Sequence, residues 1–141
     1  MSSYQHLYFR LLNKINLSNS EIYMKPIVLC YSKCGTCQKA IKWLNANSIE
    51  FVNRPIKEEN PTKEELQLWL AKSNLPINKF VNTSGLLYKE HKMKDKVKVL
   101  PATELIEILS QNGMMVKRPI LLAGDTVLVG FKEEEWEKVL L

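Results

Sequence analysis

The sequence predicts a single-domain, mixed α/β protein, and three observations support this fold class. The chain has 141 residues, which is about one domain's worth of sequence. Short strand-like apolar runs alternate with stretches of helical spacing, first in the order β-α-β and finally in the order β-β-α. Hydrophobic residues make up 45% and charged residues 25% of the chain, a globular composition that argues against a disordered or fibrous protein.

Charge and cysteine content narrow the functional classes. The chain carries 20 Lys and Arg against 15 Asp and Glu, a net charge of +5, which is well short of the balance of a histone-like protein. Three cysteines are an odd number and argue against a fully paired secreted scaffold. No apolar run approaches the ~18 residues of a membrane span. We therefore expect a cytoplasmic protein without membrane association, whose cysteines serve chemistry.

Residues 1–23 differ from the rest of the chain. Apolar positions from Tyr4 to Ile15 follow helical spacing, without the apolar core or cleavage site of a signal peptide. Met24 then stands directly before the first strand-like run. Either Met24 is the physiological start or the leader is a loosely attached extension; alternatively, the leader is a helix that binds a partner or a second copy. Residues 24–141 form the predicted domain.

The first part of this domain is predicted to be a β-α-β unit. Pro26–Tyr31 is a short apolar run bounded by turn residues, so it predicts a buried strand. Helical spacing begins at Thr36 and fades in the Asn-rich segment 45–48, and residues 49–52 predict a second strand. Two strands joined in this way are parallel, with a right-handed crossover.

A helical block is predicted next. Its first helix is capped either by Asn60, with proline at the first helical position, or by Thr62, with Glu65 closing a capping box. Residues 76–83 predict another short helix, residues 86–100 are helical in part, and a helix from Pro101 ends at Asn112.

The end of the chain predicts a β-hairpin followed by a helix. Residues 120–122 and 126–129 are apolar runs on either side of the turn sequence Ala-Gly-Asp. Residues 132–141 predict a closing helix, with acidic residues in its first turn, where the helix dipole favours negative charge.

The motif CGTC at 34–37 lies between the first strand and the first helix. A thiol at a helix N-terminus faces unsatisfied N–H groups and the positive end of the dipole, which favour the thiolate. We therefore predict Cys34 as the nucleophile, and Cys37, one turn later, as the thiol that resolves its adduct through an intramolecular disulfide. Gly35 is expected to allow a tight turn into the helix. A C-x-x-C motif beside a β-α-β unit is typical of a thioredoxin-like redox site.

Two metal-based interpretations are weaker. A structural zinc site needs four ligands, and beyond the three cysteines the chain has two histidines and no second paired motif. The spacing Cys30-x3-Cys34-x2-Cys37 resembles a radical S-adenosylmethionine cluster motif, but the chain is short for the barrel of those enzymes. Cys30 also lies inside an apolar run, where a free cysteine is usually a small buried hydrophobe. We predict no metal site and a core role for Cys30.

A second candidate element is the sequence KRPI at 117–120. Proline at the start of a strand can hold a cis bond and present the preceding backbone to a ligand. In a thioredoxin-like topology this strand lies beside the first, which places Arg118 near Cys34. A guanidinium there can pair with an oxyanion or carboxylate and stabilise the thiolate. The alternative is that Arg118 is a surface charge and Pro119 only opens the strand.

Residues 24–141 resemble the arsenate reductase/Spx/MgsR family of thioredoxin-fold proteins. The resemblance rests on five segments: YSKCGTCQKAIKWL at 31–44, ENPTKEEL at 59–66, KFVNTSGLLYKE at 79–90, NGMMVKRPIL at 112–121 and VGFKEEEW at 129–136. It implies a thioredoxin-like fold, with a mixed four-stranded sheet and an inserted helical block. It also implies Cys34 as nucleophile and Arg118, beside a cis Pro119, as oxyanion contact. We expect Gly35 and Thr36, at the start of the helix, to complete the oxyanion site.

Departures from the family pattern bear on the reaction. Glutaredoxin-linked arsenate reductases carry one nucleophilic cysteine and three arginines, whereas this chain matches one of them with Arg118 and has Asn82 and Gly130 at the other two positions. Cys37 stands where that branch commonly has serine. In having this second cysteine, the chain resembles the YusI-type C-x-x-C branch. Fewer cations weaken oxyanion binding. We expect a thiol–disulfide oxidoreductase rather than a true arsenate reductase, without a bound cofactor and reduced by thioredoxin, glutaredoxin or a low-molecular-weight thiol.

The resemblance also allows a regulatory function. Spx-type proteins bind the α subunit of RNA polymerase and use the cysteine pair as a redox sensor. A basic run could suit an acidic partner or nucleic acid, or it could be a solvated helix face, since acidic residues interleave with it. Without interleaved aromatic residues we expect no direct nucleic-acid binding. The run comprises Lys89, Lys92, Lys94, Lys96 and Lys98.

Overall fold

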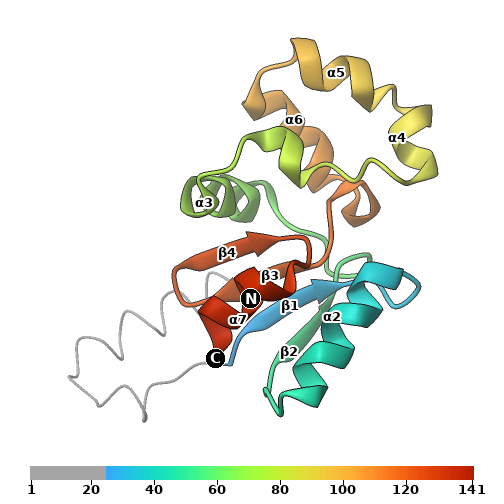
Figure 1. The fold of residues 1–141 in the computed structure, drawn as a ribbon. Coiled ribbons are helices and arrows are strands. Elements are labelled where there is room, and N and C mark those ends of the chain that lie inside the picture. The colour runs from blue at the N-terminus through green and yellow to red at the C-terminus, as the bar shows by residue number, and fades with distance from the viewer. Residues whose placement is uncertain (1–24) are drawn as a thin grey trace.

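The structure is a computed structural model that describes residues 25–141 (Figure 1). The predicted extension at 1–23 therefore lies outside the described residues. In chain order the elements are β1 (Ile27–Cys30), α2 (Gly35–Ala46), β2 (Val52–Pro55), α3 (Lys63–Ser73), the 3₁₀ turn η1 (Ile77–Phe80), α4 (Leu86–Glu90), α5 (Met93–Val99), α6 (Ala102–Ser110), the 3₁₀ turn η2 (Gly113–Met115), β3 (Ile120–Ala123), β4 (Thr126–Val129) and α7 (Glu133–Leu140).

The four strands form one mixed sheet in the order β2-β1-β3-β4. β1 pairs with β2 in parallel and with β3 antiparallel, and β3 pairs with β4 antiparallel. The predicted four-stranded mixed sheet is thus present. β3 lies beside β1, as the thioredoxin-like topology requires, and this brings the chain at 117–120 close to the end of β1.

Two apolar cores cover the two faces of this sheet. Successive strand residues point to opposite faces, so Leu29 and Ile120 join the core beneath the helical block, while Val28 and Leu121 join the core formed with α2 and α7. Figure 1 shows the helices from α3 to α6 grouped together above the sheet. The insertion between β2 and β3 therefore folds as a block over one face.

The second strand begins later than predicted. The expected strand at 49–52 is wrong: β2 runs from Val52 to Pro55. Ser48 adopts a left-handed φ of 55°, and the N–H of Ile49 donates to the carbonyl of Leu44 at 3.0 Å. Ile49 and Phe51 pack against the core around α2. The apolar residues before Val52 therefore close the helix instead of pairing with β1.

Thr62, rather than Asn60, caps the first helix of the block. The Glu65 N–H donates to the Thr62 hydroxyl at 3.1 Å, and the Thr62 N–H donates to the Glu65 carboxylate at 3.0 Å. This is the complete capping box, so the second of the two predicted caps is confirmed. Its two hydrogen bonds satisfy donors that the helix start otherwise leaves free.

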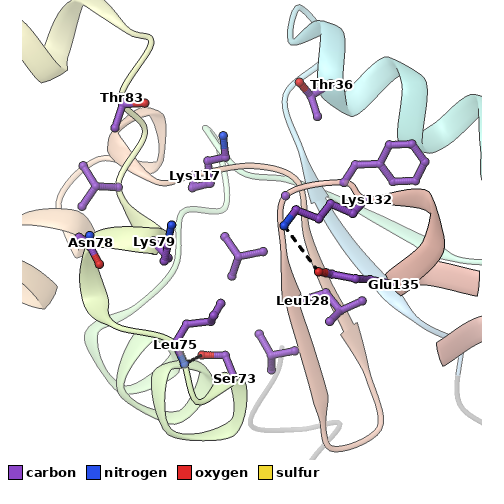
Figure 2. A pocket seen from close by; sticks show the side chains of 15 residues that line it. Thr36, Ser73, Leu75, Asn78, Lys79, Thr83, Lys117, Leu128, Lys132 and Glu135 are labelled. Atoms are coloured by element: carbon purple, nitrogen blue, oxygen red, sulfur yellow. Dashed lines mark hydrogen bonds and ion pairs between the residues drawn. The ribbon is translucent and has the colours of Figure 1, made fainter. Parts of the chain in front are cut away.

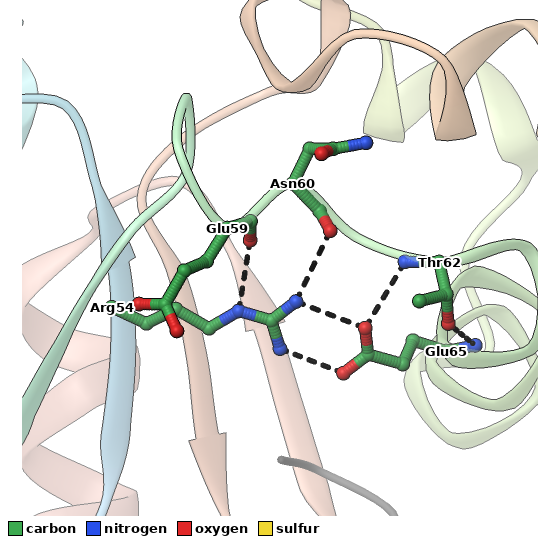
Figure 3. Close-up of polar contacts among 5 residues, drawn as sticks. All are labelled: Arg54, Glu59, Asn60, Thr62 and Glu65. Carbon is green, nitrogen blue, oxygen red and sulfur yellow. Dashed lines mark hydrogen bonds and ion pairs between the residues drawn. The ribbon is translucent and has the colours of Figure 1, made fainter.

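The carboxylate of Glu65 also forms a buried ion pair with Arg54 of β2 (Figure 3). Arg54 Nη1 donates to Glu65 Oε2 at 2.7 Å and Nη2 to Oε1 at 2.9 Å. Arg54 Nε donates to the Glu59 carbonyl at 3.0 Å, and the guanidinium lies 5.8 Å from the Trp69 ring centre. The pair connects α3 of the helical block to β2 of the sheet, and no pattern in the sequence predicts it.

The rest of the block follows the prediction, except that one predicted helix is shorter. Residues 76–83 contain a single 3₁₀ turn, η1, rather than a longer helix. The chain leaves η1 extended because Val81 pairs with Val116 in an isolated antiparallel bridge. Residues 86–100 form two short helices, α4 and α5, separated by Lys92 with a φ of 51°.

Gly113 marks a close approach between the two ends of the block. α6 ends at Ser110, two residues before the predicted stop at Asn112, and the chain then turns into η2. A Cβ at Gly113 would lie 1.9 Å from the carbonyl oxygen of Ile56, at the end of β2. Only glycine fits there without a backbone shift.

The closing hairpin and helix agree with the prediction. β3 and β4 are joined by a two-residue turn in which Gly124 has a φ of 58°, a conformation that favours glycine. α7 carries Trp136, whose Nε1–H donates to the carbonyl of Gly130 at 3.1 Å. In the part of the chain that the structure describes, no helix has the length and apolarity needed to cross a bilayer.

Candidate functional site

The CGTC motif lies at the junction of β1 and α2. Cys34 is the N-cap of α2, and its carbonyl accepts the Gln38 N–H at 3.0 Å. Its own N–H donates to the Tyr31 carbonyl at 3.0 Å, so a tight turn connects the strand to the helix. Since Cys34 makes no capping bond with its side chain, the Sγ atom remains free for other contacts.

The three cysteines differ in accessibility. All are free thiols. Cys34 is half-buried, whereas Cys37 and Cys30 are 1% and 4% exposed. A reagent or substrate can therefore reach Cys34 but not the other two in this conformation.

Cys37 lies in surroundings that favour its thiolate. A hydrogen bond with the Cys30 thiol is the main reason that the pKa of Cys37 falls to about 6. Burial opposes this shift, while the Tyr31 N–H, a hydrogen bond with Cys34 and the charge of Arg118 reinforce it. The Tyr31 nitrogen lies 3.4 Å from Cys37 Sγ. The surroundings of the enclosed Cys37 thus favour its thiolate form.

Cys30 belongs to this thiol cluster as well as to the core. Its burial agrees with the sequence prediction, but its contact with Cys37 is new. That hydrogen bond, together with burial and the neighbouring thiols, raises the pKa of Cys30, so Cys30 stays protonated and donates. The signal in the sequence is alternation along β1: Cys30 shares a face with Val28, and this face packs against α2.

The two residues between Cys34 and Cys37 leave the helix start open. A Cβ at Gly35 would meet nothing within 4 Å, and Gly35 has no left-handed φ. The expectation that a tight turn requires glycine here is therefore wrong, because an alanine would fit. Thr36 is exposed and lines a pocket beside the motif. A ligand can approach the first amides of α2 over these residues.

Arg118 precedes a cis peptide bond to Pro119, as the resemblance implies. Its Nη1 donates to the Met114 carbonyl at 3.2 Å, and its guanidinium lies 5.2 Å from the ring centre of Tyr31. Its Nε is buried without a hydrogen-bond partner in the structure. Arg118 is half-buried against Tyr31 and the Met114 carbonyl rather than an exposed surface charge, and its charge also helps to lower the pKa of Cys37.

The two positions where the family pattern has further arginines also come together here. Asn82 is buried, and its Nδ2 donates to the Met114 carbonyl at 3.2 Å, the same oxygen that Arg118 binds. Gly130 donates its N–H to the Pro119 carbonyl at 2.7 Å and has a φ of 84°. A Cβ at Gly130 would lie 3.8 Å from Lys117 Cε. Of the three arginines in the family pattern, the site therefore has one, Arg118, and Lys117 lies beside Gly130.

A pocket of about 730 Å³ extends from this site between the helical block and β4 (Figure 2). Thr36 lines it on the side of the CGTC motif, and Leu75 and Lys79 line it on the side of the helical block. Lys117 and Lys132 add two further cations. Within residues 25–141, no group of three or more His, Cys, Asp or Glu side chains is arranged to hold a metal ion.

Comparison with known proteins identifies the family. The sequence model of the ArsC family matches residues 29–139. The chain belongs to the ArsC family. It is 44% identical over 108 residues to the uncharacterized protein YusI of Bacillus subtilis, covering 77% of this chain and 92% of YusI. It is also 28% identical over 109 residues to the regulatory protein MgsR of the same organism, covering 77% of this chain and 85% of MgsR.

A solved structure supports the assignment of fold. A crystal structure of a putative ArsC family related protein from Bacteroides fragilis matches with a TM-score of 0.79 and 52% sequence identity, covering 82% of this chain and 99% of the other. The predicted α/β, thioredoxin-like fold with its inserted helical block is confirmed. The ArsC family fold thus carries the Cys34–Cys37 pair at its first strand–helix junction.

Proposed function

We propose that this ArsC family protein is a thiol–disulfide oxidoreductase in which Cys34 attacks and Cys37 resolves. The observation that carries the proposal is the division between the two thiols. Cys34 is accessible at a helix N-terminus, and Cys37 is enclosed, with its pKa lowered to about 6. An accessible thiol followed one turn later by an enclosed thiolate suits attack followed by intramolecular resolution.

The reaction consists of two exchanges. Cys34 first loses its proton to solvent, and its thiolate Sγ attacks one sulfur of a substrate disulfide. A Cys34–substrate bond forms, the substrate S–S bond breaks, and the other half leaves as a thiolate. The Cys37 thiolate then attacks Cys34 Sγ, forming the Cys34–Cys37 disulfide and releasing the second half as a thiolate. Two electrons pass from the protein dithiol to the substrate. A thiol reductant of the thioredoxin, glutaredoxin or low-molecular-weight class returns them, and no bound cofactor takes part.

The remaining predicted residues act around this pair. Arg118 orients an anionic group and stabilises the thiolate through its charge. The open helix start at Gly35 and Thr36 gives the substrate access to the backbone amides, and Pro119 fixes the backbone beside it. With Asn82 and Gly130 in the other two arginine positions, one guanidinium provides weak binding for arsenate. The substrate is therefore a disulfide rather than the oxyanion.

Trapping the covalent intermediate tests this division of labour. With a small disulfide substrate and a thiol reductant, the wild-type protein should turn over and Cys34→Ser should not. Cys37→Ser should accumulate the substrate half as a mixed disulfide, visible as an added mass on the intact protein. Cys30→Ser, which keeps a donor beside Cys37, is the matched control and should turn over. Equal turnover by Cys34→Ser and wild type would exclude the proposal.

The similarity to MgsR supports a second candidate, a redox-sensing regulator without turnover. In this function the same cysteine pair is oxidised once, and the oxidised or reduced form binds the α subunit of RNA polymerase, as the resemblance to Spx implies. Binding of the purified α subunit to the reduced and the oxidised chain distinguishes the two. A redox-dependent affinity combined with no Cys34-dependent turnover favours the regulator.

A further inference from the structure

Within residues 25–141, β4 is an edge strand that pairs with β3 on one side only. Ala123 and Thr126 flank the two-residue turn of the hairpin, and such a pair is hydrogen-bonded. Because hydrogen-bonded and non-bonded pairs alternate, Val127 and Val129 direct their N–H and C=O groups away from β3. The bond from the Gly130 N–H to the Pro119 carbonyl, at 2.7 Å, continues the same alternation.

The pocket described above runs along this edge. Val127 joins the core beneath the helical block, and Leu128 packs against the core on the opposite face of the sheet. Yet Val127, Leu128 and Val129 all line the pocket. A pocket that meets successive residues with alternating side chains must face the strand along its backbone edge. Figure 2 shows it open between β4 and the segment carrying Leu75 and Lys79.

The side chains that line the pocket carry more positive than negative charge. Three lysines line it, Lys79, Lys117 and Lys132, and they come from both walls. Its one acidic lining residue is Glu135, which pairs with Lys132 at 3.9 Å. Leu75 and Val81 add apolar surface. A segment that fits must therefore be extended, carry acidic side chains and place apolar side chains between them.

The pocket also reaches the start of α2, beside the CGTC motif. β4 is antiparallel to β3, and β3 is antiparallel to β1, so β4 and β1 run in the same direction. The residues after β4 therefore lie at the end of the sheet where β1 leads into Cys34. Thr36, between the two reactive cysteines, lines the pocket there.

We propose that this groove binds an extended, acidic segment of a protein disulfide substrate, which adds as a strand to β4. Its backbone pairs with the outward N–H and C=O groups of Val127 and Val129, and its carboxylates pair with the three lysines. A strand held in this way presents a flanking disulfide to Cys34. Main-chain pairing supplies affinity, and the lysines select for acidic sequence. The inference rests on the proposed function only for the identity of the bound chain as substrate.

A cysteine-free probe separates binding from thiol chemistry. The probe is a short fluorescent peptide in which Glu and Val alternate, compared with the same peptide in which Lys replaces Glu. We expect saturable binding of the acidic peptide, followed by fluorescence anisotropy, and no binding of the basic one. The double variant K79E/K117E should weaken binding of the acidic peptide at least about tenfold. The control K89E/K98E makes the same charge change on α4 and α5, outside the pocket, and should leave binding close to wild type.

Methylated peptides test strand addition without altering the protein. N-methylation of alternate amides removes the donors on one edge of the peptide strand. Methylation on one edge should abolish binding, and methylation on the other edge should preserve it. Equal binding by both methylated peptides would mean that attraction to lysine alone holds the probe, which overturns strand addition. Binding of the basic peptide, or dimerisation of the chain lost in K79E/K117E, would overturn the proposed occupant.

The test also separates this inference from the proposed function. Turnover of a small disulfide reports on Cys34 and Cys37 and does not require the groove. Peptide binding with no such turnover supports the groove and excludes the oxidoreductase. Turnover with no peptide binding excludes the groove and leaves the oxidoreductase in place.

Discussion

Arg54 is a buried arginine and Arg118 is a half-buried one, and their surroundings are opposite. Arg54 donates from Nε and both Nη atoms, to the Glu65 carboxylate at 2.7 and 2.9 Å and to the carbonyls of Glu59 and Asn60 at 3.0 and 3.3 Å. Arg118 contacts two carbonyls through Nη1, and its buried Nε has no partner in the structure. Both guanidinium groups also lie over an aromatic ring.

The difference separates a structural charge from one available to a ligand. A buried charge is tolerated when its hydrogen bonds are satisfied, as those of Arg54 are within the fold. Within residues 25–141 Arg118 has no carboxylate partner among the ion pairs, and one of its donors remains unused. An arginine with spare donors beside a thiolate can take an anionic group without breaking the fold.

We expect the largest effect from Arg54→Ala, which should lower the free energy of unfolding. Removing one member of a buried ion pair leaves the other charge uncompensated and costs about 3–5 kcal/mol. Denaturant unfolding should show this loss. Arg118→Ala is the matched control and should lose much less, since it leaves no buried carboxylate unpaired. Comparable losses in the two variants would contradict the distinction between the arginines.

A second prediction concerns Cys30, whose hydrogen bond is the main cause of the low pKa of Cys37. With its pKa at about 6, Cys37 stays a thiolate as the pH falls through neutrality and becomes protonated near pH 6. Resolution should therefore slow below that pH, by about tenfold per unit. Cys30→Ala should move this midpoint to higher pH, and Cys30→Ser, which keeps a donor, should move it less. Thiolate absorbance and the decay of the mixed disulfide measure both. An unchanged midpoint in Cys30→Ala would exclude the hydrogen bond as the cause.

The smallest expected effect is that of Arg118→Gln on the same midpoint. The charge of Arg118 contributes least among the causes that lower the pKa of Cys37, so its loss should raise that pKa by less than Cys30→Ala does. Arg118→Lys keeps the charge and should stay close to wild type. A shift larger than that of Cys30→Ala would mean that Arg118 interacts with the thiolate directly.

Features set by local chemistry could be predicted from the sequence. The Thr62 capping box and the Gly124 turn each depend on a few adjacent residues. The order β-α-β and β-β-α was visible because apolar periodicity changes between strands and helices. The same local signals located the CGTC motif at a helix start and the KRPI segment at the beginning of β3.

Features set by contacts distant in sequence could not be predicted. β2 begins only at Val52 because Ile49 and Phe51 pack against the core around α2. No local pattern distinguishes an apolar residue that pairs in a strand from one that packs against a helix. The sequence predicts Glu65 only as part of the capping box and assigns no role to Arg54, because their ion pair depends on the packing of α3 against β2. The Cys30–Cys37 contact likewise requires the packing of β1 on α2.

The contact between Gly113 and Ile56 has a consequence for how the molecule is put together. The chain enters the helical block at Ile56 and returns to the same point at Gly113, where the two backbones nearly touch. A segment whose two ends meet can be lengthened, shortened or exchanged without moving the strands on either side. The block nevertheless shares its core with one face of the sheet, through Leu29 and Ile120. Changes in its length are therefore best tolerated in the parts of the block that lie away from this core.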